Sequence, residues 1–131
     1  MDWFSRFVVS WEVSITLESQ FCIECLNNAL KIAIPEIHNS DQGSQFTSNA
    51  YFDILKGSTA QISMDGKGRC FDNIFTERLW RSLKYEEVYP KNYQTVQETE
   101  RGLAEYFEKY NYRRLHQSLG YQAPYEVYSQ R

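Results

Sequence analysis

Apolar and polar residues alternate near the start of the chain. Apolar side chains stand at every second position, at Phe7, Val9, Trp11 and Val13. A repeat of two residues is typical of a β-strand that buries one of its faces. The pattern therefore predicts a first strand over residues 7–13.

The period becomes helical further along the chain. Over residues 17–34 one buried stripe is formed by Phe21, Cys22, Cys25, Leu26, Ala29 and Ala33. This spacing predicts an amphipathic helix that Pro35 ends. Residues 36–40 then form a short predicted strand, which delivers Asp41 to its C-terminal end.

Turn-forming residues at 42–45 separate that strand from a second predicted helix. We expect Thr47 to cap a helix over residues 48–56 and Gly57 to stop it. A third short strand is predicted over Gln61–Met64.

Two further helices are predicted in the second half of the chain. The first runs from about Asn73 to Val88 and is closed by Pro90, and the second opens with a capping box, Thr95 to Glu98. The apolar face of the second helix is formed by Val96, Leu103, Tyr106, Phe107 and Tyr110. Alternating strands and helices predict a layered α/β domain. Three short strands are few, because sheets usually have about four to six, and this indicates a missing segment upstream.

Charge is distributed unevenly along the chain. The net charge of −3 at first argues against nucleic acid as a partner. Residues 1–65, however, hold 3 Lys/Arg and 8 Asp/Glu, whereas residues 66–131 hold 11 and 9. The basic residues gather in a stripe made of Lys67, Arg69, Arg78, Arg81 and Lys84. Such a stripe is either a solvated helix face or a surface for DNA phosphates.

Composition limits the class of protein. With 131 residues, 42% of them hydrophobic, the chain is long enough for one domain with a core. No apolar run approaches the roughly eighteen residues that a membrane span needs, so we expect a cytoplasmic protein with no membrane partner.

The cysteines and histidines are weak candidates for metal or redox chemistry. The 3 cysteines are an odd number, so we expect free thiols, and Cys22 and Cys25 lie inside a predicted helix, where core packing is the expected role. His38 and His116 lack accompanying cysteine pairs, which argues against a zinc site. Aromatic residues at 106–112 are either core or a surface that stacks bases.

Two carboxylates form the strongest candidate site. Asp41 follows a predicted strand, and Glu77 lies on a predicted helix with 35 residues between them. Helical spacing places Lys84 on the same face as Glu77, away from the apolar residues at 75, 79 and 83. Carboxylates that converge at a strand end could share Mg²⁺ or Mn²⁺, whereas the plainer interpretation is a surface turn and a solvated helix.

Several sequence blocks carry a resemblance to a known family. They are Asp-Trp-Phe-Ser-Arg at 2–6, His-Asn-Ser-Asp-Gln-Gly-Ser-Gln-Phe at 38–46, Ser-Met-Asp-Gly-Lys-Gly at 63–68, Asp-Asn-Ile-Phe-Thr-Glu at 72–77, Ser-Leu-Lys at 82–84 and Tyr-Asn-Tyr-Arg-Arg-Leu-His at 110–116. The chain resembles the integrase-like catalytic core of bacterial insertion-sequence transposases of the DDE type. The resemblance implies an RNase H-like α/β fold with a mixed sheet flanked by helices. It also implies DNA cleavage and strand transfer in transposition, with two Mg²⁺ or Mn²⁺ ions held by three carboxylates.

The resemblance assigns roles to particular residues. Asp41 matches the second catalytic carboxylate, Glu77 the third, and Lys84 a basic residue associated with the transposon end. Arg113 and Arg114 join the basic stripe as expected DNA contacts, and His38, Asn73 and His116 are expected to support the site. The expected partners are transposon-end and target DNA and, in the complete protein, other copies of the chain.

The same resemblance implies that part of the core is missing. The family's first carboxylate precedes the block at 2–6, so we expect one or two upstream strands to be absent and the chain alone to be inactive. Asp2 is expected to cap a turn instead. Residues 1–131 are interpreted as one core, with an RNase H-like part at 1–90 and a C-terminal helix and tail at 91–131. The alternatives are a non-catalytic remnant that binds DNA or dimerises, and a glycoside hydrolase that would use Asp41 and Glu77 as its pair.

Overall fold

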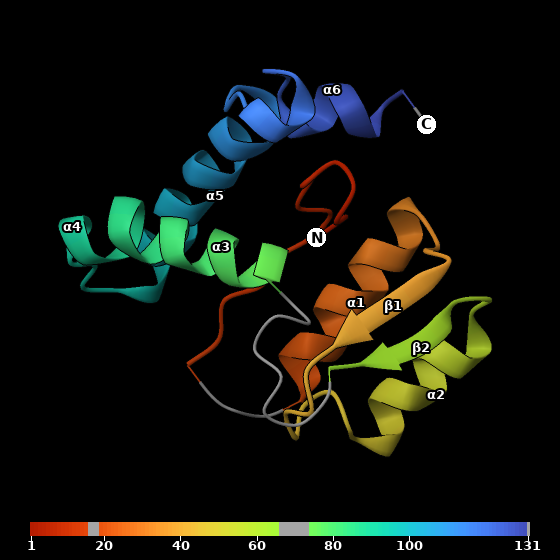
Figure 1. Ribbon diagram of the computed structural model, residues 1–131. Helices are drawn as coiled ribbons and strands as arrows, with labels where there is room; N and C mark the ends of the chain where they lie inside the picture. The colour runs from red at the N-terminus through yellow and green to blue at the C-terminus, as the bar shows by residue number, and fades with distance from the viewer. Residues whose placement is uncertain (16–18, 66–73, 131) are drawn as a thin grey trace. The chain divides into compact units, whose positions relative to one another are not determined.

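The protein folds into two compact units. The computed structural model describes residues 1–15, 19–65 and 74–130. Ser10–Ile74 form the first unit, called here the sheet unit, while Met1–Val9 and Phe75–Arg131 together form the second, the helical unit. Figure 1 colours the chain by residue number, and each unit is described by itself. The interpretation of residues 1–131 as one core divided at residue 90 stays a prediction.

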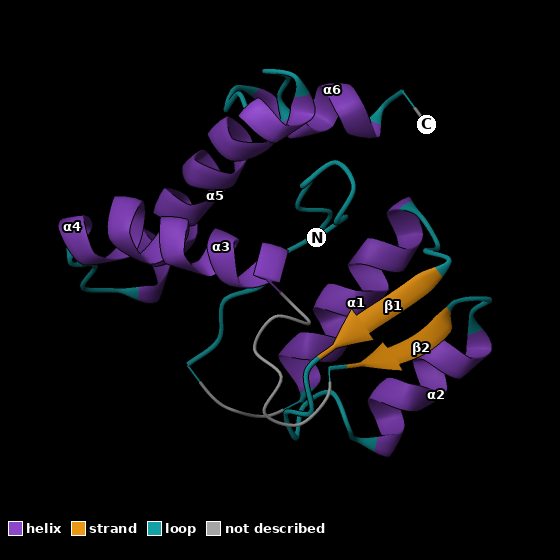
Figure 2. Cartoon of the chain, in the orientation of Figure 1, coloured by secondary structure: helices purple, strands orange, loops and turns teal. Residues whose placement is uncertain are grey.

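The sheet unit is a parallel β-α-β arrangement that follows one helix. Its elements are α1 (Gln20–Ile32), β1 (Ile37–Ser40), α2 (Asn49–Gly57) and β2 (Gln61–Met64). The two strands pair in parallel, from Ile37 opposite Gln61 to Ser40 opposite Met64, and both arrows point the same way in Figure 2. The predicted strands at 36–40 and 61–64 are therefore confirmed, and a short parallel pair needs a helical crossover such as α2.

A small apolar core holds α1 against α2. Leu26, Tyr51 and Leu55 are buried, with 5%, 4% and 1% of their surface exposed. Partly buried side chains surround them, namely Cys22, Ile23, Leu30, Phe46 and Ile54. The predicted core role of Cys22 is confirmed, and Cys22 and Cys25 are both free thiols.

The ends of α2 follow local chemistry. Ser48 is the N-cap, because its Oγ accepts the Tyr51 N–H at 3.3 Å. The prediction of Thr47 as the cap is therefore wrong by one residue: Ser48 has the extended backbone that a cap requires, while the Thr47 hydroxyl donates back to the Gly43 and Ser44 carbonyls. The helix ends at Gly57, as predicted.

The predicted strand over residues 7–13 is wrong. Residues 6–14 have no regular secondary structure, although Phe7 and Val8 are buried. A strand needs a neighbouring strand to pair its N–H and C=O groups. At Val8 a side chain takes that role: Asn111 Oδ1 accepts the Val8 N–H at 2.8 Å, and Asn111 Nδ2 donates to the Val8 carbonyl at 3.0 Å.

The first part of the helical unit is one long, irregular helical segment. It consists of α3 (Ile74–Leu83), the π-helical turn η2 (Lys84–Val88) and α4 (Tyr89–Lys91). The sequence predicted that the segment closes at Pro90. It instead ends at Asn92, whose φ of 47° is left-handed. The wider π turn ahead of Pro90 accommodates a ring that would clash inside a regular α-helix. Residue 73, the predicted start, lies outside the described residues.

The second part of the helical unit is built on α5 (Val96–Tyr112), followed by the 3-10 turn η3 (Gln117–Leu119) and α6 (Pro124–Tyr128). Thr95 caps α5 as predicted, since its Oγ1 accepts the Glu98 N–H at 3.1 Å. The Glu98 carboxylate reaches the N–H of Gln94 rather than that of Thr95. Of the predicted apolar face, Leu103, Phe107 and Tyr110 are buried, whereas Val96 is 39% exposed.

An aromatic cluster fastens residues 1–9 to the end of the chain. The Phe7 ring is stacked on Tyr128 with centroids 4.5 Å apart and also contacts Tyr125 and Tyr112. Asp2 caps the turn that leads to Phe7, as predicted, because its Oδ2 accepts the Ser5 N–H at 3.0 Å. Among the described residues, no helix is long and apolar enough to cross a membrane.

Candidate active site and nucleic-acid interface

Asp41 lies at the point where the chain leaves the sheet. It directly follows β1, and its side chain is exposed. Its Oδ1 accepts the Gly43 N–H at 2.8 Å, which folds the carboxylate back over the turn. A Cβ on Gly43 would lie 2.9 Å from this Oδ1, so a larger residue there would displace the carboxylate.

Asp65 is the acidic residue at this edge that the sequence analysis missed. It directly follows β2, and its N–H donates to the Ser40 carbonyl at 2.8 Å, extending the parallel ladder by one bond. Asn39 Nδ2 donates to Asp65 Oδ1 at 2.7 Å, and Gln42 Nε2 donates to the Asp65 carbonyl at 3.1 Å. These bonds hold the residues on both sides of Asp41. The signal was available, since Asp65 follows a correctly predicted strand just as Asp41 does.

His38 lies on β1 and contacts α2. Its Nε2 lies 3.1 Å from the Tyr51 hydroxyl, and the two rings meet edge to face. Burial lowers the pKa of His38, so the neutral imidazole is favoured, and burial raises the pKa of the Tyr51 hydroxyl. His38 thus ties β1 to α2, and its expected support of the Asp41 site stays a prediction.

Glu77 lies on the exposed face of α3. Leu79 and Leu83 are buried at 5% exposure each, while Glu77 and Lys84 are exposed. The predicted division of this helix into an apolar and a charged face is therefore confirmed. Arg78 and Arg81 are exposed as well. Within the described residues, Glu77 and the three basic side chains of this helix make no salt bridge.

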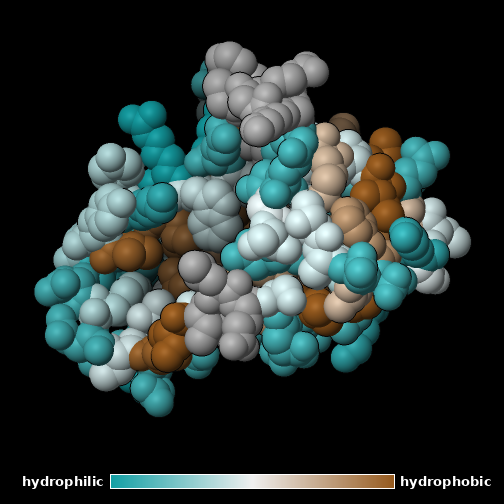
Figure 3. All heavy atoms as spheres, turned by 90° about the horizontal axis from the view of Figure 1, so that it is seen from below, coloured by the Kyte–Doolittle hydropathy of each residue, from teal (hydrophilic) through white to brown (hydrophobic). Residues whose placement is uncertain are grey.

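Aromatic side chains continue the basic face of α3 into the π turn. Arg81 lies over the Tyr85 ring at 6.0 Å, and Tyr85 meets Tyr89 edge to face at 5.4 Å. Trp80, Tyr85 and Tyr89 are 49%, 66% and 61% exposed. Figure 3 shows one face of the molecule, on which brown patches of hydrophobic residues lie among teal hydrophilic ones. Basic and aromatic side chains that alternate on one surface are typical of nucleic-acid contacts.

Arg114 is held by an ion pair on the helical unit. Its guanidinium binds Glu86 through two hydrogen bonds, of 2.6 and 3.0 Å, and the Tyr106 hydroxyl donates to the same carboxylate at 2.9 Å. The Arg114 hydrogen bond lowers the pKa of Glu86, and Glu86 raises the pKa of Arg114. Arg113 is exposed at the end of α5. DNA contacts by Arg113 and Arg114 stay predictions, and Arg114 would have to exchange Glu86 for a phosphate.

His116 lies beside the end of α5. Its ring packs edge to face on Tyr110 at 5.4 Å, and its buried Nε2 has no hydrogen-bond partner among the described residues. Burial lowers the pKa of His116, with nearby Arg114 acting in the same direction. A supporting role for His116 stays a prediction.

Some predicted residues fall outside the described structure. Lys67, Arg69, Cys70 and Asn73 lie in the stretch 66–73, which is not described. Asp41 belongs to the sheet unit and Glu77 to the helical unit. Across residues 1–15, 19–65 and 74–130, no group of three or more His, Cys, Asp or Glu side chains is placed to hold a metal ion.

Aspartates follow both strands of the parallel pair, at the edge where ligands bind in α/β sheets. Two family profiles, both described as Integrase core domain, match the chain, one over residues 1–70 and the other over residues 58–124. The chain belongs to the integrase core domain family. The fold of this family is RNase H-like, and its enzymes are DDE polynucleotidyl transferases.

The similar curated proteins are bacterial transposases. The chain is 34% identical over 128 residues to the transposase for insertion sequence element IS904 of Lactococcus lactis, covering 95% of this chain and 51% of that protein. It is 32% identical to the transposase for IS629 of Shigella sonnei, covering 97% and 44%. The putative transposase InsK for IS150 of Escherichia coli is 32% identical, with 99% and 47% covered. The chain thus spans about half the length of the curated relatives it matches.

Proposed function

We propose that this chain carries the second and third carboxylates of a transposase core that cuts and joins DNA at the ends of an insertion sequence. The observation that carries the proposal is Asp41 at the end of a parallel strand, in a chain that belongs to the integrase core domain family. In α/β sheets, ligands gather at the carboxyl ends of the strands. Transposition is also the process that the names of these relatives describe.

The carboxylates suit a hard divalent cation. Asp41 and Glu77 offer only oxygen donors and both are exposed, which fits Mg²⁺ or Mn²⁺ better than a softer metal. Two such ions, when bound, supply an activated attacking oxygen and a stabilised leaving oxygen in phosphoryl transfer. The chain's own contribution is positioning: the Gly43 N–H orients Asp41, and the buried leucines of α3 turn Glu77 outward.

The basic face of α3 would hold the DNA backbone. Arg78 and Arg81 are exposed on the helix that carries Glu77, and Lys84 follows them at the start of η2, so a strand bound by them would pass beside that carboxylate. Phosphate contacts of this kind position the strand without reading its sequence. Since the relatives are transposases, the proposed substrate is DNA, at transposon ends and at the target, and the proposed place of action is the bacterial nucleoid. A homo-oligomer would bring two ends together.

A metal-binding experiment tests the carboxylates without relying on turnover. Mn²⁺ bound to the 131-residue chain is counted by electron paramagnetic resonance, with Asp41→Asn and Glu77→Gln as variants. Each variant is expected to weaken Mn²⁺ binding by about tenfold or more, since removing one of few charged ligands costs over about 1.4 kcal/mol. Asp53→Asn and Glu24→Gln alter exposed carboxylates on α2 and α1 and serve as controls. Equal binding by all five proteins would refute the assignment of Asp41 and Glu77.

DNA binding is tested separately. Fluorescence anisotropy with a duplex oligonucleotide is measured at several salt concentrations for the wild type, Lys84→Ala and Arg81→Ala. Each variant should lower the slope of log affinity against log salt by about 1, because one phosphate contact is lost. Lys31→Ala on α1 and Lys56→Ala on α2 are the matched controls. If Lys84→Ala and Arg81→Ala leave the slope of log affinity against log salt unchanged, the DNA binds to another surface.

A further inference from the structure

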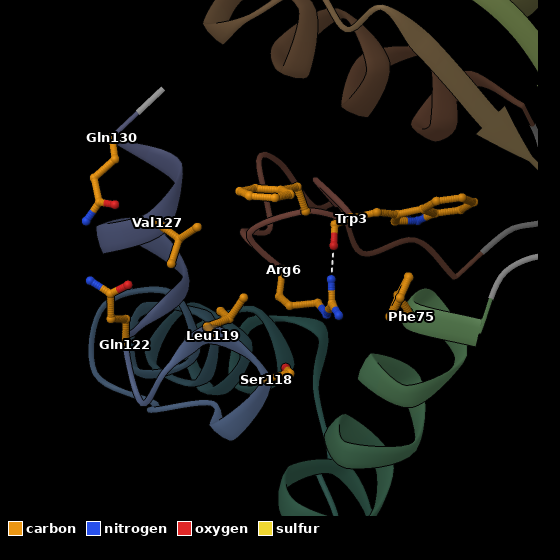
Figure 4. Close-up of a pocket in the computed structure, with 9 residues that line it drawn as sticks. Trp3, Arg6, Phe75, Ser118, Leu119, Gln122, Val127 and Gln130 are labelled. Carbon is orange, nitrogen blue, oxygen red and sulfur yellow. Dashed lines mark hydrogen bonds between the residues drawn. The ribbon is translucent and has the colours of Figure 1, made fainter.

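A pocket of about 720 Å³ opens in the helical unit, outside the exposed face of α3. Figure 4 shows its lining: the turn with Trp3 and Arg6 on one side, Phe75 at the start of α3, and residues of η3 and α6 across from them. The pocket holds three aromatic side chains, with Phe4 as the third, and two amides, Gln122 and Gln130. Its volume lies within the range of about 300–1,000 Å³ that is usual for small-molecule sites.

Arg6 is built into this pocket by a strained backbone. Its φ of 67° is unusual for a residue with a side chain. The turn is fixed by an Arg6 N–H bond to the Asp2 carbonyl at 2.8 Å, while the guanidinium donates to the Trp3 carbonyl and lies over the Phe75 ring, 3.7 Å from its centroid. Strained residues that are fixed in this way occur at ligand sites.

The chemistry of the lining selects a flat, polar-edged ligand. A guanidinium carries five N–H donors, more than the Trp3 carbonyl can accept, so donors remain for a planar acceptor. The amides of Gln122 and Gln130 each offer a donor and an acceptor, and the aromatic rings offer stacking surfaces. Arg78 lies three residues beyond Phe75, which places a second cation on the adjacent helix surface.

We propose that this pocket receives one unpaired nucleobase of a DNA strand whose backbone lies along α3. The proposal rests on the DNA-binding function proposed above and specifies which part of the DNA the pocket takes. Stacking on aromatic side chains stabilises bound bases, and Arg and Gln side chains are suited to the polar edges of bases. Moving a base out of the helical stack costs least where that base is already unpaired. Bulges and strand ends are therefore the expected targets.

Three duplexes test this: one fully paired, one with a single-base bulge, and one with an abasic site in place of the bulged base. Anisotropy gives the affinity of the 131-residue chain for each. We expect the bulged duplex to bind about tenfold more tightly than the abasic duplex, which corresponds to about 1.4 kcal/mol. Phe4→Ala and Gln122→Ala should remove this preference and leave the affinity for the abasic duplex unchanged. Phe4 is 63% exposed, so its removal spares the core, and thermal unfolding checks both variants.

Tyr121→Asn is the matched control, because Tyr121 is 65% exposed, lies outside the pocket lining and has a left-handed φ of 61° that Asn tolerates. It should keep the full preference. Salt-dependent binding to all three duplexes with equal affinity would overturn the pocket proposal and leave the DNA-binding function standing. Binding to none of them would refute both. If sedimentation shows a dimer that Phe4→Ala dissociates, and no bulge preference is found, the pocket takes a second copy of the chain and the proposal fails.

Discussion

The two units hold their candidate site residues in different ways. In the sheet unit, Asp41 sits in an exposed turn whose geometry depends on local bonds to Gly43 and on the ladder bond from Asp65 to Ser40. In the helical unit, Glu77 projects from a helix anchored by two buried leucines. The first carboxylate is therefore positioned by backbone hydrogen bonds, and the second by side-chain packing.

The units also differ in what keeps them folded. The sheet unit depends on a three-residue apolar core, and Ile37 and Ile62 on its strands are 58% and 39% exposed. The helical unit adds to its core a polar clasp, formed by Asn111 and Val8, and a bidentate ion pair. Disturbance of the apolar core should thus affect the sheet unit most, while the helical unit should respond to the loss of single polar groups.

The largest effect is expected from Leu55→Ala in the sheet unit. Leu55 is 1% exposed, and removing a buried leucine side chain typically costs about 2–5 kcal/mol. Hydrogen exchange should accelerate at β1 and β2, while the amides of α5 keep their protection. Ile37→Ala, at a 58% exposed position, is the control and should change little. Equal acceleration in both units would show that they unfold together.

The next effect is expected from Asn111→Ala in the helical unit. The change leaves the buried Val8 N–H and carbonyl without partners, and we expect a loss of about 1–3 kcal/mol. Residues 1–9 should lose hydrogen-exchange protection first. Asn111→Asp keeps the acceptor but sets a buried carboxylate against the Val8 carbonyl, so its cost should be at least that of Asn111→Ala. Full protection at Val8 in the Asn111→Ala protein would show that Asn111 does not hold residues 1–9 in place.

The sequence predicted the regular elements well where the period was clear. Both strands of the sheet and α5 were identified from patterns that local propensity and packing share. The alternation at 7–13 gave a wrong prediction. It shows that one face of the segment is buried, but it does not show that a neighbouring strand is present. Phe7 and Val8 are buried, but their partners are an asparagine and a set of aromatic rings more than 100 residues away. Nothing local to residues 7–13 contains that information.

The candidate site was predicted only in part. Asp41, Glu77 and Lys84 have the exposure that the spacing required. The pairing of Arg114 with Glu86 was not foreseen, because the π turn that presents Glu86 has no recognised signature in sequence. Asp65 was missed although the same strand-end argument applied to it.

A moderate effect is expected from Gly102→Ala on α5. Alanine favours a helix by up to about 1 kcal/mol over glycine, yet a Cβ here would lie 2.7 Å from Tyr93 Cε1. Tyr93 would have to move and release its hydrogen bond to Glu87, a carboxylate only 5% exposed, which costs about 1–3 kcal/mol. We expect a net loss of about 1 kcal/mol in urea unfolding. Gly102→Ala in a Tyr93→Phe background should be less harmful, and a stabilised Gly102→Ala single variant would refute the contact.

The smallest effect, and the most specific one, concerns the Glu86–Arg114 pair. The Arg114 hydrogen bond lowers the pKa of Glu86 in the folded protein below its ordinary value of about 4.3. The unfolded chain therefore binds the proton more readily, so the contribution of the pair is complete above about pH 4.3 and is lost as the pH falls through the lower folded pKa. Both side chains are partly exposed, at 39% and 43%, so the contribution is about 0.5–1 kcal/mol at most. Glu86→Gln should remove this amount at pH 7 and almost none at pH 3, measured by urea unfolding of the helical unit at both pH values. Glu108→Gln changes an exposed carboxylate on α5 and is the control. A Glu86→Gln loss of stability that is equal at both pH values would show that the Glu86 carboxylate does not act through its charge.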